Sequence, residues 1–138
     1  MTYTLSTTID APFDDVVPVV TTALQDEGFG ILSEIDVKTT VKKKLDVDIN
    51  QYQILGACNP SLAHEGLVEE PELGALLPCN VIVYETEEGN VVVSAVDPQQ
   101  LLSLADNPAL DSIGDDVFGR FERVISTVDD EFETVSEA

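Results

Sequence analysis

The hydrophobic pattern changes its period along the chain, and this change is the feature that most constrains the fold. Residues 3–9 alternate apolar and polar side chains, which is typical of a half-buried strand. Residues 13–24 repeat apolar side chains every three or four positions, which predicts a helix that stops at Gly28. Residues 29–37 return to alternation and predict a second strand. Its apolar face is expected to carry Phe29, Ile31, Ile35 and Val37.

Pro18 lies within the first helical segment, where a proline removes a backbone hydrogen bond. Two interpretations are open. Either the helix starts late, with Asp14 or Asp15 near its N-cap, or it begins at Pro12 and kinks. We favour the late start.

Turn-forming residues divide the middle of the chain into short elements. Residues 36–45 are polar and predict a short helix or turn, and residues 52–58 predict a third strand that stops at Asn59-Pro60. Asn caps helices well and Pro fits the first helical position, so a short helix is expected over residues 61–69. The next segments are expected to be a crossing at 71–78, a strand at 80–86, a hairpin turn at 87–90 and a strand at 91–96.

The C-terminal part predicts one long helix. Asp97-Pro98 begins a short helical turn, and Asn107-Pro108 begins the long helix. The acidic residues of this helix lie largely off its apolar stripe, so the stripe is expected to face the core or an interface. The stripe consists of Leu110, Ile113, Val117, Phe121, Val124, Ile125 and Val128.

The order of these elements predicts an α+β fold, in which helices cover one face of an antiparallel sheet. A chain of 138 residues is close to the commonest domain size, so one domain is expected. We assign residues 1–132 to this domain and residues 133–138 to an acidic C-terminal tail that frays.

The two hairpin strands show little polar alternation. Tyr84, Val92 and Val96 would point away from the helices, which leaves an apolar second face on the sheet. An apolar face of this kind needs a partner, and a second copy of the chain is the simplest one. We therefore expect a homodimer.

The charge balance indicates in which solvent the protein is stable and which classes of partner it can bind. The sequence has 6 basic and 27 acidic residues, a net charge of −21, and the acids are scattered over every surface segment. Self-repulsion of such a chain weakens in molar salt, where the Debye length is about 3 Å, so a halophilic protein is expected. Nucleic acid and anionic membranes need clustered Lys and Arg, and the only cluster is Lys42, Lys43 and Lys44. Neither is expected as a partner.

The sequence also predicts a cytoplasmic location. It has no secretory n-region before an apolar core and no stretch near the roughly 20 apolar residues that span a bilayer. It has two cysteines, Cys58 and Cys79, which are expected to be free thiols in a reducing cytosol, although one bridge is conceivable.

A candidate site lies where two strand ends carry a Cys-Asn pair each. If the strands are antiparallel neighbours, Cys58-Asn59 and Cys79-Asn80 meet. Cys58 directly precedes a helix N-terminus, which would lower the pKa of its thiol. The alternative is that both thiols are small buried side chains and Asn59 is only a helix cap. The candidate binding residues are Cys58, Asn59, Pro60, His64, Cys79 and Asn80.

Other chemistry has weaker support. Cys58, Cys79 and His64 make a conceivable metal set, but they lack CxxC spacing and no metal site is predicted. His64 is the only histidine, so Ser-His or Cys-His catalysis would have to use it. No cofactor motif is present, and the cofactor stays unknown.

The segments GACNP (56–60) and LLPCNVIVYE (76–85) resemble the domain of unknown function 302 family, and the resemblance spans most of the chain. It implies a TATA-binding-protein-like fold, β-α-β-β-β-β-α with added short helices, that is usually dimeric. It implies no established activity. The family-like positions are Gly56, Cys58, Asn59, Pro60, Pro78, Cys79 and Val81.

Two functional hypotheses follow. The first is a homodimeric module that binds a small molecule, a thiol or a partner at the candidate site. The second is a thiol-dependent redox or sulfur-handling protein that uses Cys58 and Cys79. The sequence leaves open whether the protein is an enzyme.

Overall fold

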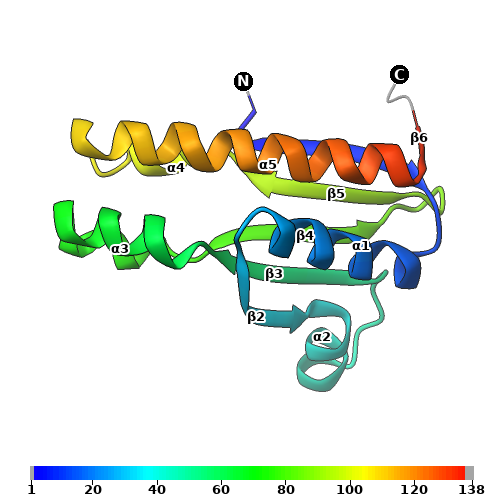
Figure 1. The fold of residues 1–138 in the computed structure, drawn as a ribbon. Helices are drawn as coiled ribbons and strands as arrows, with labels where there is room; N and C mark the ends of the chain where they lie inside the picture. The colour runs from blue at the N-terminus through cyan, green and yellow to red at the C-terminus, as the bar shows by residue number, and fades with distance from the viewer. Residues whose placement is uncertain (1, 136–138) are drawn as a thin grey trace.

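A computed structural model describes residues 2–135 of the chain and has one six-stranded sheet with helices around it (Figure 1). The strand order is β2-β3-β4-β5-β1-β6, and every neighbouring pair is antiparallel. This confirms the predicted α+β class. The elements are β1 (Thr4–Asp10), α1 (Phe13–Asp26), β2 (Gly30–Asp36), α2 (Val37–Leu45), β3 (Tyr52–Cys58), α3 (Pro60–Glu69), η1 (Pro71–Leu76), β4 (Cys79–Glu85), β5 (Val91–Val96), α4 (Pro98–Ser103), η2 (Pro108–Leu110), α5 (Asp111–Glu131) and β6 (Glu133–Thr134).

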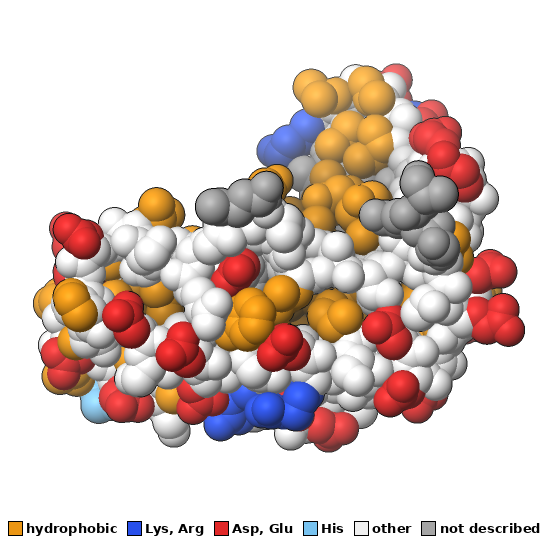
Figure 2. All heavy atoms as spheres, turned by 90° about the horizontal axis from the view of Figure 1, so that it is seen from above, with side chains coloured by type: hydrophobic (Ala, Val, Ile, Leu, Met, Phe, Trp, Pro, Cys, Tyr) orange, Lys and Arg blue, Asp and Glu red, His pale blue; other side chains and the backbone are white. Residues whose placement is uncertain are grey.

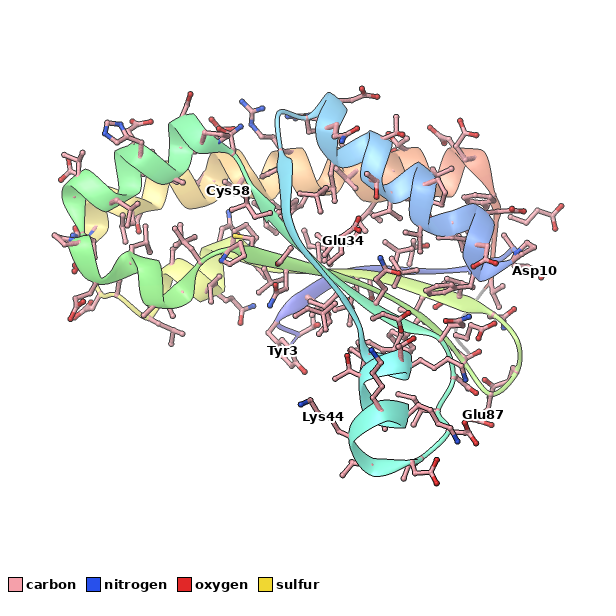
Figure 3. The ribbon with its side chains drawn as sticks, turned by 90° about the horizontal axis from the view of Figure 1, so that it is seen from below. Tyr3, Asp10, Glu34, Lys44, Cys58 and Glu87 are labelled. Carbon is pink, nitrogen blue, oxygen red and sulfur yellow. The ribbon has the colours of Figure 1, made fainter. Side chains whose placement is uncertain are left out.

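The core lies between one face of the sheet and the helices α1 and α5 (Figures 1 and 3). The apolar stripe predicted for the long helix is buried there, except that Ile125 is only half-buried. The rings of Phe29 and Phe121 meet with centroids 5.0 Å apart and join the start of β2 to the middle of α5. Burial of this stripe against the sheet stabilises the fold through the hydrophobic effect.

The first helix starts earlier than we favoured. Phe13 is its first residue and Pro12 its N-cap, so Pro18 lies inside the helix and the late start is wrong. Phe13 and Val16 are both buried, and their burial favours helix over the first turn. Pro18 and Asp14 are exposed, so water can reach the Asp14 carbonyl that Pro18 leaves without a helical partner.

The single apolar face expected for residues 29–37 is also wrong. The β2–β3 register shifts between Ile31 and Ser33, and this bulge divides the strand. Ile31 pairs with Ala57 beside the core, whereas Ile35 pairs with Ile54 on the opposite face and is exposed. An inserted residue inverts the alternation after it, which the sequence pattern alone does not reveal.

The expected fraying from residue 133 does not hold for the tail residues that the structure describes. Glu133 and Thr134 form β6 on the outer edge of β1, opposite Asp10 and Ile9. The Val135 N–H donates to the Thr8 carbonyl at 2.7 Å. Residues 136–138 of the predicted tail lie outside the described residues.

The sheet has a second face, which α1 and α5 do not cover. In the β4–β5 hairpin, Val83 and Val93 belong to the core, so their neighbours Tyr84 and Val92 point to the other side, as expected. We call this side the open face. Its residues are Thr4, Ser6, Thr8, Ile35, Tyr52, Ile54, Asn80, Ile82, Tyr84, Val92, Ser94 and Val96.

Candidate functional site

The two cysteine-bearing strand ends meet, as the sequence predicted. Cys58 is the last residue of β3 and Cys79 is the first residue of β4, and the antiparallel register pairs Ala57 with Cys79. At this end of the sheet the chain turns into α3 after β3 and arrives from η1 before β4. The thiols are therefore held by strands that the core fixes in place.

A cavity of about 40 Å³ lies beside these strand ends. This is roughly three times the space that one ordered water needs. Its walls come from β3, β4, α3, η1, α4, α5 and the segments before β2 and β4, and nearly all of the lining side chains are apolar. The lining residues are Phe29, Ala57, Cys58, Asn59, Leu62, Ala63, Leu73, Leu77, Cys79, Pro98, Leu102, Ile113 and Val117.

Both thiols at the cavity are free and protonated in neutral solution. Cys79 is only 8% exposed, and burial raises the pKa of its thiol to about 11, with a further contribution from nearby Cys58. Partial burial also raises the pKa of the half-buried Cys58. The thiolate is the reactive form of cysteine. The site therefore favours the neutral, unreactive form of both thiols.

The raised pKa of Cys58 reverses the sequence-based expectation of a lowered one. The sequence-based expectation relied on free N–H groups at the N-terminus of α3. Two of these N–H groups already donate to oxygens of Asn59. The Asn59 Oδ1 accepts from the Leu62 N–H at 3.2 Å, and the Asn59 carbonyl accepts from the Ala63 N–H at 2.9 Å. With these donors occupied, desolvation sets the direction of the Cys58 pKa shift.

Asn59 and Pro60 act mainly on local structure. Asn59 is the N-cap of α3 and also lines the cavity, so both expected roles of this residue meet in one side chain. Its amide lies against Gly28, where an added Cβ would come within 2.9 Å of Nδ2. Pro60 takes the first helical position and is exposed, outside the cavity lining.

The structure separates two other candidates from the thiols. His64 is exposed on α3, where Leu62 and Ala63 face the cavity instead. Asn80 follows Cys79 along a strand, so it points to the open face. Within residues 2–135, no group of three or more His, Cys, Asp or Glu side chains could hold a metal ion.

Sequence reasoning missed the helical walls of the cavity. Pro98 and Leu102 on α4, and Ile113 and Val117 on α5, also line the cavity. The apolar stripe signalled that Ile113 and Val117 are buried, but helical periodicity does not say which strand end they contact. No sequence signal connected α4 to the thiols.

A second hollow, of about 250 Å³, lies on the open face. Asn80, Ile82, Ser94 and Val96 form part of its floor, and Tyr3 stands at its rim with 73% of its surface exposed. The rings of Tyr52 and Tyr84 stack beside it with centroids 5.2 Å apart. Unlike the thiol cavity, this hollow is broad enough for side chains of another protein.

The surface matches the charge pattern of the sequence. Figure 2 shows acidic side chains spread over one whole face of the molecule rather than gathered in one place. None of the helices within residues 2–135 has the length and apolar character needed to cross a bilayer.

The fold and the site define a class of small α+β protein with one antiparallel sheet, helices over one face, and a thiol-lined cavity at the β3–β4 end. The model of one family, "Domain of unknown function DUF302", matches residues 5–128. The chain belongs to this family, which confirms the resemblance seen in the sequence.

Known proteins similar to this chain include a curated relative and a solved structure. An "Uncharacterized protein" of Aquifex aeolicus (strain VF5) is 31% identical over 91 residues, which cover 66% of this chain and 57% of that protein. The chain thus spans little more than half of that relative. The crystal structure of an uncharacterized conserved DUF302 protein from Bacillus stearothermophilus superimposes with a TM-score of 0.85 at 25% identity, covering 93% of this chain and 99% of the other.

Proposed function

We propose that the protein is a binding module whose thiol-lined cavity takes a small uncharged ligand, or the apolar end of a larger one. The observation that carries this proposal is the convergence of Cys58 and Cys79 on one mostly apolar cavity. Apolar walls with a few placed polar groups are typical of small-molecule sites. A neutral thiol compound fits both the walls and the two protonated sulfurs.

The polar groups of the site support an uncharged ligand. Among residues 2–135, every buried side-chain nitrogen or oxygen already has a hydrogen-bond partner. A charged ligand would lose its hydration without gaining a counter-charge, because no Lys or Arg lines the cavity. The volume of about 40 Å³ limits the buried part of the ligand to a few heavy atoms.

Methyl NMR in molar KCl tests this proposal. Titration with ethanethiol should shift the methyl resonances of Ala57 and Ala63, which line the cavity, and leave those of exposed Ala75 and Ala109 unchanged. Ala63→Leu should fill the cavity and abolish the shifts, whereas Ala75→Leu adds the same atoms elsewhere and should preserve them. Uniform shifts at all four alanines, or none at any concentration, would contradict the proposal.

We further propose that the module is a homodimer that associates through the open face. Tyr84, Ile82 and Val96 remain partly exposed there, and the adjoining hollow has the size for a partner's side chains. A twofold dimer would cover this surface on both copies at once.

Sedimentation equilibrium in molar KCl measures this association. The wild-type protein should be a dimer at micromolar concentrations, and Ile82→Asp should make it a monomer. Val68→Asp, at a 68% exposed position on α3, places the same charge away from the open face and should leave the dimer intact. A wild-type protein that stays monomeric would refute the dimer.

The second candidate function is thiol–disulfide exchange, supported by two free cysteines at one cavity. In this scheme a deprotonated Cys58 attacks a low-molecular-weight disulfide and releases one thiol. Cys79 then displaces the second thiol, so the protein is oxidised to a disulfide and the substrate is reduced to two thiols. The raised pKa of both cysteines makes this the less favoured function near neutral pH.

The proposed setting is a salt-rich, reducing cytoplasm. The net charge of −21 supports high salt, and two free cysteines support a reducing compartment.

A further inference from the structure

The lysines of this chain are concentrated in one element. All four, Lys38, Lys42, Lys43 and Lys44, lie in α2, which contains no acidic residue. The two remaining basic residues are arginines on α5. In a chain with a net charge of −21, α2 is therefore the one strongly positive element.

Two of these lysines are already engaged. The Lys38 Nζ donates to the Ile49 carbonyl at 2.6 Å, and Lys42 forms ion pairs with Asp46 and Asp48. Lys43 and Lys44 are exposed, and neither side chain makes a hydrogen bond or ion pair with any other residue between 2 and 135. Two positive charges thus stand free on an acidic protein.

Helix α2 projects from the sheet on the side of the open face, away from α1 and α5 (Figure 3). It packs mainly against β2 and β3, and none of its residues is buried. A helix of nine residues with so little packing has marginal stability on its own. Tyr3 and Lys44 extend on this same side of the molecule (Figure 3).

Apolar side chains accompany the free lysines. Leu45, at the end of α2, is 69% exposed, and Val47 follows it at 48%. Figure 2 shows hydrophobic side chains gathered on the projecting part and in the corner where it meets the body, with blue Lys or Arg atoms beside them. The projecting helix and the open face therefore form an apolar corner with a positive rim.

We propose that α2 is a docking arm that binds a second copy of this chain, with Lys43 and Lys44 contacting carboxylates of that copy. This inference rests on the proposed homodimer and names the element that stabilises it. A twofold axis would place the arm of each protomer against the open face of the other. The acidic surface of the second copy complements the lysines, and its open face complements the apolar corner.

The shape of the corner favours a second copy over a membrane. A bilayer surface is flat, so it could touch the tip of α2 but not the open face behind it. The acidic surface elsewhere would also be repelled by anionic lipids. A second protomer can fill the corner and meet the lysines together.

The test compares charge at the arm with the same charge elsewhere. In Lys43→Gln/Lys44→Gln the net charge falls by two, and Thr22→Glu/Gln25→Glu lowers it equally on exposed α1 positions. Sedimentation equilibrium is run at the lowest KCl concentration at which all variants keep the wild-type circular dichroism spectrum. The lysine variant should raise the dimer dissociation constant about fivefold, a difference that shrinks as KCl increases, and the α1 variant should change it much less.

The outcomes separate the arm from the dimer. A wild-type dimer whose dissociation constant is unaffected by the lysine variant would overturn the arm and leave the open-face dimer standing. Equal weakening by both variants would show general repulsion and also overturn it. A wild-type monomer would overturn both proposals. Lysine-dependent co-sedimentation of a wild-type monomer with phosphatidylglycerol vesicles would assign α2 to a membrane instead.

Discussion

Gly28 is the residue at which the end of α1, the cap of α3 and Arg120 of α5 come together. Its φ of +89° lies in the region that favours glycine, and an added Cβ would lie 2.9 Å from Asn59 Nδ2 and 3.2 Å from Arg120 Nη1. A side chain at this position would therefore strain the backbone and push against Asn59 in the cavity wall.

We predict that Gly28→Ala lowers the free energy of unfolding by about 2 kcal/mol, because the side-chain ends of Asn59 and Arg120 must shift in addition to the backbone strain. Gly89→Ala is the matched control. Gly89 has a φ of +83° but no atom within 4 Å of an added Cβ, so only the strain, about 1 kcal/mol, should appear. Denaturant unfolding in molar KCl measures both variants, and equal losses would show that the contacts at Gly28 do not matter.

Cys79 should make stability fall in alkaline solution. Its thiol has a pKa of about 11 in the folded protein and an ordinary pKa of 9.0 when unfolded. Below pH 9 the thiol is protonated in both states, whereas between pH 9 and 11 the unfolded state loses the proton first. The contribution of the Cys79 thiol to the free energy of unfolding is therefore fully present below pH 9. It is lost as the pH rises to 11, and the loss is on the order of 2 kcal/mol.

Comparison of wild type with Cys79→Ala between pH 8 and 11 isolates this effect, because lysine and tyrosine titration is common to both proteins. Unfolding curves at each pH should show a steeper loss for wild type. Parallel pH profiles would mean that the Cys79 thiol ionises in the folded protein as it does in the unfolded chain.

Single residues of the cavity could be predicted in part. Cys58, Asn59 and Cys79 were identified because a Cys-Asn pair ends one strand and begins its neighbour. His64 and Asn80 were grouped with them by proximity in sequence, but strand alternation and helix rotation direct these side chains elsewhere.

Among the elements, α1 and α5 are joined by Arg120. Its Nη1 donates to the Glu27 carbonyl at 2.6 Å, and its Nε donates to Asp116 at 2.7 Å. The positive charge thus lies at the C-terminus of α1, where the helix dipole favours it.

We predict that Arg120→Met, which keeps an apolar stem, lowers the free energy of unfolding by about 1–2 kcal/mol through the loss of these charged hydrogen bonds. Arg123→Met removes an arginine one turn further along, whose side chain is 60% exposed and pairs with the Glu27 carboxylate. Its unfolding curve should stay close to wild type. Equal curves for wild type and Arg120→Met would rule out a role for this link.

The bounds of the elements can be predicted from the local sequence where capping or turn-forming residues mark them. The third strand and the helix after it were placed correctly because Asn59-Pro60 is a cap followed by a first-turn proline. Pro18 and the β2 bulge were misjudged for a different reason. Burial of Phe13 in the core sets the start of α1, and the register with β3 sets the bulge in β2. Neither can be read from the local hydrophobic periodicity.

At the scale of the whole molecule, the charge of −21 should control stability. We predict that the free energy of unfolding rises steeply with KCl into the molar range, because screening weakens the self-repulsion of the folded surface. Chemical unfolding by urea across a KCl series measures this dependence.

A charge-neutralised variant provides the control for the salt series. Glu88→Gln/Asp130→Asn/Glu131→Gln removes three exposed carboxylates, so its salt dependence should be shallower than that of wild type. Equal stability of the wild-type protein in dilute buffer and in molar KCl would contradict the proposed adaptation to salt.

The global architecture was the most predictable level. The order of strands and helices left few antiparallel arrangements, and the apolar hairpin correctly predicted apolar side chains on the second face of the sheet. The thiol cavity was not predictable, because it depends on how α4 and α5 meet the end of the sheet.

The reactivity of the two cysteines tests the proposed binding site most directly. Folded protein in molar KCl is treated with iodoacetamide at a series of pH values, and modification of each cysteine is followed by mass spectrometry. If Cys58 and Cys79 line a cavity as protonated thiols, Cys58 reacts slowly near pH 7 and faster only above pH 9, and Cys79 stays unmodified until the pH nears 11. Rapid modification of Cys58 at neutral pH would contradict this account and favour thiolate chemistry.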